Sequence, residues 1–297
     1  MSVYSEIFRA RSEPLQPIPA GAAQRLMPLN PVRCVLLDVY GTMFISGSGD
    51  VGVAAEAGEA AALAAACQAC GYHGRLDAAR GVKLLLETIA ACHRRERDRG
   101  LEYPEVEIVE IWERWWGEMV RRGWLAAGGA GDMARLAVEY EVRVNPAWPM
   151  PGLQEVLRQL RGQVTLGIIS NAQFFTVEMF AGLLGQTPEQ AGFDPDLQVY
   201  SYHYRRAKPD PFLYQLAAHA LAKRGLAARE ILYIGNDMLN DIQPARAVGF
   251  RTGLFAGDAR SLRWREGDRR VSGVRPDVVL TELSSIARCI SGSVGAE

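Results

Sequence analysis

Four short segments carry acidic, hydroxyl, amide and ammonium side chains where they could act together. Residues 34–42 read CVLLDVYGT, an apolar run that ends in Asp38 and is followed at once by a Gly-Thr turn. The unbroken aliphatic run predicts a buried parallel strand, because a strand covered on both faces needs no polar alternation. A carboxylate at the carboxyl end of such a strand lies where open α/β sheets bind ligands. Asp38 is therefore a candidate nucleophile, metal ligand or both, unless it only caps the turn.

The second and third segments add groups that could hold oxygen atoms of a substrate. Residues 164–171 read VTLGIISN, a strand pattern ending in Ser170 and Asn171, whose side chains can orient phosphate or carboxylate oxygens without adding charge. Residues 205–211 read RRAKPDP, directly before a helical pattern, and the two prolines restrict the loop that carries Lys208. A fixed ammonium group balances carboxylates and phosphate oxygens. The alternatives are an ordinary polar turn and an exposed basic turn.

The fourth segment could complete a cation site. Residues 231–242 read ILYIGNDMLNDI, a third apolar strand that runs into Asp237, with Asp241 at the start of the next helix. Two or three carboxylates that converge without His or Cys suit a hard cation, usually Mg²⁺. Asp241 could instead be only the N-cap of that helix, and we give this role substantial weight. We give it little weight for Asp237.

In this order, the four segments resemble the motifs of the haloacid dehalogenase superfamily, over roughly residues 32 to 290. The resemblance implies an α/β fold with a Rossmann-like, doubly wound parallel sheet and an inserted all-helical cap domain. It implies that Asp38 is a nucleophile that forms an aspartyl intermediate, assisted by Lys208. It also implies that the substrate is bound by Thr42, Ser170, Asn171 and Lys208. The implied cofactor is Mg²⁺, held by Asp38, Asp237 and the backbone carbonyl of Tyr40, with Asp241 as support.

Tyr40 departs from the pattern of the family's phosphatases, which carry a second Asp two residues after the nucleophile. Such a carboxyl protonates the leaving alkoxide and later deprotonates water, a contribution worth about 10²- to 10⁴-fold in rate. A phenol, with a reference pKa of about 10, is a poor base near neutral pH. Either the leaving group needs little help, or another group supplies the proton, or turnover is slow.

The motifs combine features of two branches of the superfamily. The Asp-x-Tyr-Gly-Thr of residues 38–42 matches the dehalogenases, whose halide leaves without a proton, whereas Gly-Asn-Asp at 235–237 resembles the metal-dependent phosphatases. A cation is needed to offset a phosphoryl dianion but not to displace chloride. We therefore favour a Mg²⁺-dependent hydrolase of a small phosphorylated metabolite. The alternatives are hydrolysis of a 2-haloacid and a binding or regulatory protein of low activity.

The surrounding sequence indicates how these segments are positioned. The proline-containing residues 1–31 predict an N-terminal arm, extended along the surface or partly mobile, which could contribute to a homodimer contact. The glycine-rich residues 45–52 predict a hinge into a cap domain at 49–146, with helices at about 53–70, 76–98, 104–125 and 132–141. The aromatic stripe within 108–119 is more typical of core packing than of a substrate pocket. Alternating strands and helices predict the core at 32–48 and 147–290.

Composition is consistent with a cytoplasmic enzyme that acts on a small molecule. The chain has 297 residues, 48% hydrophobic residues and a net charge of −1, so charge gives no argument for nucleic acid or membrane partners. Residues 1–31 show no signal peptide, and no apolar run is long enough to span a membrane. Five scattered cysteines predict a reducing compartment. Cys67, Cys70 and His73 superficially suggest zinc or redox chemistry, but no second ligand pair accompanies them.

Overall fold

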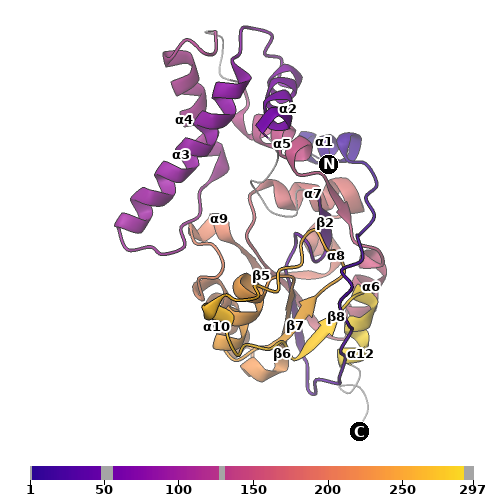
Figure 1. Cartoon of the computed structure of the whole chain (residues 1–297). Coiled ribbons are helices and arrows are strands. Elements are labelled where there is room, and N and C mark those ends of the chain that lie inside the picture. The colour runs from indigo at the N-terminus through magenta and orange to yellow at the C-terminus, as the bar shows by residue number, and fades with distance from the viewer. Residues whose placement is uncertain (1, 48–55, 127–130, 291–297) are drawn as a thin grey trace.

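The computed structural model describes residues 2–47, 56–126 and 131–290, and its centre is a six-stranded parallel sheet. The strand order is β5-β4-β1-β6-β7-β8, so the chain moves to one side of β1 and then to the other (Figure 1). This reversal next to β1 is the point at which doubly wound sheets open a crevice. The strands are β1 (Cys34–Leu37), β4 (Thr165–Ser170), β5 (Phe193–Tyr200), β6 (Ile231–Gly235), β7 (Arg251–Phe255) and β8 (Val278–Leu280). The predicted fold class is confirmed.

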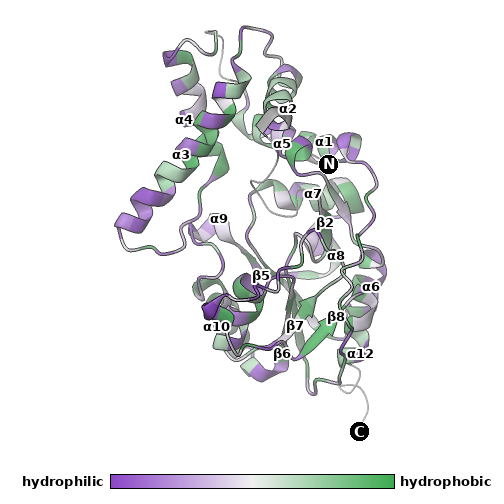
Figure 2. Ribbon diagram, viewed as in Figure 1, coloured by the Kyte–Doolittle hydropathy of each residue, from purple (hydrophilic) through white to green (hydrophobic). Residues whose placement is uncertain are grey.

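Helices cover both faces of the sheet, which explains why its strands are apolar without alternation. One face packs against α1 (Val3–Arg11), α6 (Leu153–Leu160), α7 (Phe175–Leu184) and α12 (Ile286–Ile290). The other packs against α10 (Phe212–Lys223) and α11 (Gln243–Ala247). Figure 2 shows β7 and β8 in green, in keeping with their hydrophobic sequences. The short elements are α8 (Pro188–Ala191), α9 (Ser201–Tyr204), η1 (Ala228–Glu230), η2 (Met238–Ile242), η3 (Arg269–Val271) and η4 (Leu283–Ser285).

A helical unit is inserted in the chain between β1 and β4 of the six-stranded sheet (Figure 1). It contains α2 (Glu56–Ala69), α3 (Ala78–Asp98), α4 (Ile108–Arg121) and α5 (Met133–Val144), close to the four predicted helices. Its separate hydrophobic core includes Trp112 and Trp115, so the aromatic stripe packs inward as expected. We call this unit the cap. The predicted boundary at residues 48 and 49 and most of the predicted hinge lie outside the described residues.

The two strands that lead into and out of the cap pair with each other. Strand β2 (Phe44–Ser46) is antiparallel to β3 (Ala147–Pro149), with Ile45 opposite Trp148. A side-chain hydrogen bond from Ser46 Oγ to Asn145 Oδ1, 2.7 Å long, adds to this pairing. The cap is therefore joined to the core through a small two-stranded ribbon.

The beginning of the chain is helical, which the sequence analysis did not predict. Helix α1 packs against α7 of the core and also against α5 of the cap. Towards the cap, Tyr4 donates a hydrogen bond to Asp132 at 3.0 Å, and Arg11 pairs with Glu139 at 2.8 Å. Beyond the helix the segment runs without regular structure as far as a β-bridge between Arg25 and Val279.

Among the described residues, no helix is long and apolar enough to cross a membrane.

Candidate active site

Three neighbouring strands end at the same edge of the sheet and present the predicted side chains. Leu37, at the end of β1, is in register with Ile168 of β4 and Ile234 of β6. Asp38 therefore emerges between the last residue of β4, Ser170, and the turn that follows β6. Because all three strands are parallel, residues 130 to 200 positions apart in sequence meet in one crevice.

Lys208 joins two of the predicted acids in a buried ion-pair cluster. Its Nζ lies 2.8 Å from Asp38 Oδ1 and 2.6 Å from Asp241 Oδ1. All three residues are at least nine-tenths buried. Two carboxylates around one ammonium leave a net negative charge when all are ionised, and the low dielectric strengthens each attraction. The structure thus brings together Asp38, Lys208 and Asp241 from three distant segments.

Neighbouring backbone and side chains hold Lys208 in place. Asn171 Oδ1 accepts a hydrogen bond from the backbone N–H of Lys208 at 2.7 Å, and Asn171 Nδ2 donates to its carbonyl at 3.3 Å. The side chain of Asn171 therefore fixes the loop that carries the Lys208 ammonium, and its predicted substrate contact stays a prediction. Ser170 is fully buried at the strand end, where its Oγ donates to the carbonyl of Asn171 at 3.4 Å.

Tyr233 completes the cluster, and the sequence analysis missed it. Its hydroxyl donates to Asp241 Oδ1 at 2.8 Å and lies 3.3 Å from Lys208 Nζ. It also lies 3.2 Å from the carbonyl of Ile169. A tyrosine in the middle of an otherwise aliphatic strand is the one local signal that could have indicated a polar role, since a buried hydroxyl needs partners.

The pKa values of Lys208 and Asp241 are both raised, for different reasons. Burial by itself would lower the pKa of Lys208, but Asp241 and Asp38 outweigh it and raise that pKa. Burial raises the pKa of Asp241 to about 6; Asp38 and Asp237 act in the same direction, and Lys208 opposes them. Asp241 is therefore mostly ionised at neutral pH, and Lys208 keeps its proton.

The turn after Asp38 is tightly packed. Gly41 adopts a φ of +77°, and a side chain there would clash with Asn236 and Ser261, so glycine is required on both counts. Thr42 is fully buried and donates from Oγ1 to Asn236 Oδ1 at 3.2 Å. The predicted substrate contact of Thr42 stays a prediction.

The surroundings of the Tyr40 hydroxyl do not suit it to act as a general acid or base. Its hydroxyl lies 3.0 Å from Thr176 Oγ1 on α7. Burial, reinforced by nearby Glu141, raises the pKa of Tyr40 further above its usual range. The side chain therefore stays protonated throughout the neutral range.

Asp237 has a capping role to which we gave little weight, and its predicted metal contact stays a prediction. Its carboxylate accepts hydrogen bonds from the backbone N–H groups of Leu239 and Asn240, so it caps η2. Asp241, to which we had given that role, instead points to Lys208 and accepts from the backbone N–H of Asp237 at 2.9 Å. The assignment was wrong because the cap lies one residue before the helical turn, whereas Asp241 follows it by a full turn and faces inward.

The acids around Asp38 are already paired with cations of the protein. Arg265 binds Asp237 through both Nε, at 3.0 Å, and Nη2, at 2.5 Å. No group of three or more His, Cys, Asp or Glu side chains able to hold a metal occurs in residues 2–47, 56–126 and 131–290. Mg²⁺ requires several oxygen ligands in octahedral geometry. Lys208 and Arg265 occupy carboxylate oxygens of the Mg²⁺ site predicted from Asp38, Asp237 and the backbone carbonyl of Tyr40, with Asp241 as support. That site stays a prediction, and we assign no step to a metal.

A cavity of about 440 Å³ lies between the cap and the core beside this cluster. Its core wall includes Tyr40, in the same turn as Asp38, and Asn171, which follows the neighbouring strand β4. Its cap wall comes from α2, α3, α4 and α5 and is mainly aliphatic and aromatic. A small molecule in this cavity would contact Tyr40, two residues from Asp38, and Asn171, which holds the Lys208 loop.

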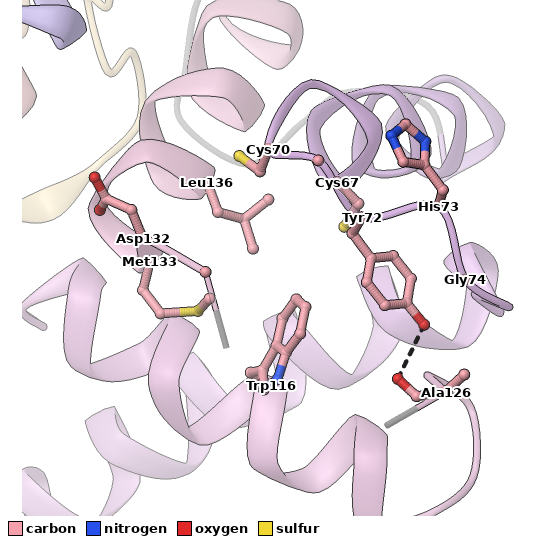
Figure 3. A pocket seen from close by; sticks show the side chains of 12 residues that line it. Cys67, Cys70, Tyr72, His73, Gly74, Trp116, Ala126, Asp132, Met133 and Leu136 are labelled. Atoms are coloured by element: carbon pink, nitrogen blue, oxygen red, sulfur yellow. Dashed lines mark hydrogen bonds between the residues drawn. The ribbon is translucent and has the colours of Figure 1, made fainter. Parts of the chain in front are cut away.

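A second cavity, within the cap, contains the Cys-x-x-Cys of the sequence (Figure 3). Its volume is about 290 Å³. In Figure 3 the sulfur of Cys70 and the ring of His73 point away from each other. Burial raises the pKa of Cys67 to about 12 and that of Cys70 to about 11, so both are protonated thiols at neutral pH. These residues do not form the ligand set of a zinc site.

Comparison with known proteins gives one family and a set of similar folds. A family model described as haloacid dehalogenase-like hydrolase matches residues 32–249. The 2-haloacid dehalogenase of Pseudomonas syringae pv. tomato DC3000 is 18% identical with a TM-score of 0.56, over 88% of this chain and 99% of that one. The L-2-haloacid dehalogenase of Xanthobacter autotrophicus is 18% identical with a TM-score of 0.50, over 88% and 99%. Identities this low show a shared fold. No curated protein matches the sequence.

Proposed function

Because the chain belongs to the haloacid dehalogenase-like hydrolases, we propose that it hydrolyses a carbon–halogen bond of a small organic molecule through an ester on Asp38. It is a hydrolase, and the remaining question is which bond it breaks. The observation that carries this choice is that each of the three acids is paired with a cation of the protein. Lys208 holds Asp38 and Asp241, and Arg265 holds Asp237. Carbon–halogen displacement requires no divalent cation, whereas phosphoryl transfer relies on one to balance charge.

In the first step, an oxygen of Asp38 attacks the carbon that bears the halogen. A carbon–oxygen bond forms, the carbon–halogen bond breaks, and the halide leaves with the electron pair. Lys208 contacts Asp38 Oδ1 at 2.8 Å, so we assign Oδ2 as the attacking oxygen. Because halide needs no proton, Tyr40 at the position of the family's general acid costs this reaction nothing.

In the second step, water attacks the ester carbonyl of Asp38 and releases the alcohol product. The carboxylate of Asp38 is regenerated and one proton is released. Asp241 is the remaining carboxylate in contact with Lys208, and its pKa of about 6 keeps it largely ionised at neutral pH. We assign it the proton of the attacking water.

A second candidate is Mg²⁺-dependent hydrolysis of a small phosphorylated metabolite. Specific support comes from two buried hydroxyls, Thr42 and Ser170, near a buried ammonium, an arrangement suited to phosphate oxygens. This reaction would require Arg265 to release Asp237 and Lys208 to share Asp38 with the metal. The present pairing favours the first candidate.

One assay separates the two candidates. The full-length protein is incubated with a panel of chlorinated and brominated small acids, alcohols and amines in EDTA, and halide release is measured. A parallel panel of phosphorylated metabolites is incubated with Mg²⁺, and phosphate release is measured. Asp38→Asn is the blank for both panels. We expect halide release that EDTA does not diminish; phosphate release that needs Mg²⁺, with no halide released, would instead establish the second candidate.

A further inference from the structure

The cavity between cap and core has an unusual combination of charge and apolarity. Two carboxylates on its cap wall, Glu59 on α2 and Glu141 on α5, come from separate helices. No Lys or Arg is among the described residues that line it. Glu105 also lines it, but its two oxygens already accept from the Val106 N–H and the Ser201 hydroxyl. The cavity thus offers negative charge to its contents and no fixed positive charge.

Glu141 is the carboxylate that links this wall to the reaction centre. It acts electrostatically on Tyr40, two residues from the nucleophile, and on Tyr140 in the cap. One of its oxygens accepts a hydrogen bond from Asn145 Nδ2 at 3.0 Å. Burial raises the pKa of Glu141 to about 7, so its charge is incompletely stabilised by the protein alone. A cation bound beside it would supply what the surroundings lack.

Aromatic rings and one buried nitrogen add independent support. Trp112 and Tyr140 meet edge to face at 5.2 Å between ring centroids, and both line the cavity. Such rings attract cations as well as apolar groups. His93 lines the same cavity, and its Nε2 is shielded from solvent without a hydrogen-bond partner. Burial and nearby Arg97 lower the pKa of His93, so the neutral ring could accept a hydrogen bond from a ligand N–H.

We propose that this cavity selects a substrate whose non-reacting half carries a primary ammonium group on an apolar carbon skeleton. Glu141 supplies the charge that binds the ammonium, His93 Nε2 offers an acceptor in the same cavity, Glu59 adds negative charge, and the skeleton packs on Trp112 and Tyr140. A carboxylate or phosphate in the same place would meet like charge with no basic partner. The proposal rests on the proposed function insofar as the cavity receives the part of the substrate that Asp38 does not attack.

Direct binding of three related molecules to the full-length protein tests this charge preference. Isothermal titration calorimetry compares 2-phenylethylammonium, neutral 2-phenylethanol and anionic 3-phenylpropanoate, which share a ring and a two-carbon chain. We expect the ammonium to bind about tenfold more tightly than the alcohol, the order of one hydrogen bond to a charged group. The anion should bind most weakly.

Substitutions identify the residue responsible. Glu141→Gln keeps the acceptor for Asn145 but removes the charge, so the ammonium should lose about five- to tenfold in affinity while the alcohol is unchanged. Glu59→Gln provides a second, smaller effect, and Glu113→Gln, on the exposed side of α4, is the matched control. Equal affinity for ammonium and alcohol, or an unchanged preference in Glu141→Gln, would overturn the proposal.

Failure of this proposal can be told apart from failure of the proposed function. If the protein prefers the ammonium compound but releases no halide, the proposed specificity stands and the proposed reaction is refuted. Halide release from neutral or anionic substrates, without ammonium selectivity, would retain the reaction and reject the specificity.

Discussion

The ion-pair cluster of the core and the cap wall of the neighbouring cavity differ in how completely their charged groups are paired. In the core cluster, Asp38, Asp241 and Asp237 each contact a cation of the protein within 3 Å. On the cap wall, Glu141 has an amide as its hydrogen-bond partner, and His93 Nε2 has none. The groups to which we assign the chemistry are held by ion pairs, whereas the groups proposed to select the substrate keep hydrogen-bonding capacity for a ligand. Substitutions in the core cluster and on the cap wall should therefore affect activity and stability differently.

The largest effect is expected on turnover, from a substitution of Asp38 in the core cluster. Asp38→Asn removes the nucleophile, so halide release should fall by at least about 10³-fold. Mass spectrometry of the wild-type protein during turnover should show an added substrate fragment on the peptide that contains Asp38. Asp196→Asn, at an exposed site on β5, is the control and should retain full activity. Undiminished turnover in Asp38→Asn would contradict the assignment of the nucleophile.

The next effect is on stability. Lys208→Met leaves Asp38 and Asp241 buried without their cation, which should lower the free energy of unfolding by about 3–5 kcal/mol. Urea unfolding followed by circular dichroism measures this difference. Lys83→Met, whose partner Glu87 is 4.0 Å away on an exposed face of α3, should change stability by less than about 0.5 kcal/mol. If the two variants were equally stable, the core cluster would not be tightly coupled.

A smaller effect on stability is expected from Arg265, which pairs with Asp237 of the core cluster. Arg265→Met removes two hydrogen bonds from Asp237 and should cost about 1–3 kcal/mol of unfolding free energy. Arg270→Met, which breaks an exposed pair with Asp268, is the matched control. Activity of the variant is then measured with and without Mg²⁺. A phosphatase activity that appears only in Arg265→Met with Mg²⁺ would show that the arginine excludes a metal.

The smallest effect concerns pH and the cap wall. Burial raises the pKa of Glu141 from 4.5 to about 7, so the folded chain holds this proton more tightly than the unfolded chain. Stability should therefore be lost through Glu141 as pH rises from 4.5 to 7, and Glu141→Gln should escape that loss. We expect the variant to gain about 1–2 kcal/mol relative to wild type between pH 5 and pH 8. Urea titrations at the two pH values measure the difference, and a pH-independent difference would contradict it.

The sequence predicted the groups that the sheet brings together better than the groups that pair with them. Asp38, Ser170 and Lys208 could be found because the first two lie at the ends of apolar strands, Lys208 directly precedes a Pro-Asp-Pro segment, and parallel strands end at one edge. Arg265 could not, because it lies 28 residues beyond Asp237 in a loop without a local pattern. The exchanged roles of Asp237 and Asp241 have the same origin, since spacing does not show which of two acids faces inward. The cavity depends on side chains from four helices whose relative placement has no sequence signature.

The first helix has a consequence for how the chain can be handled experimentally. Helix α1 contacts Glu178 of the core through Ser2, while Tyr4 and Arg11 reach Asp132 and Glu139 on the other unit. Gly182 lets the two backbones approach closely, because any side chain there would collide with Ser5 and Phe8. Separation of the cap from the core on this side must therefore break these contacts. A purification tag fused directly ahead of Ser2, or proteolytic trimming of the first dozen residues, should weaken the attachment of the cap to the core without altering a residue of the ion-pair cluster.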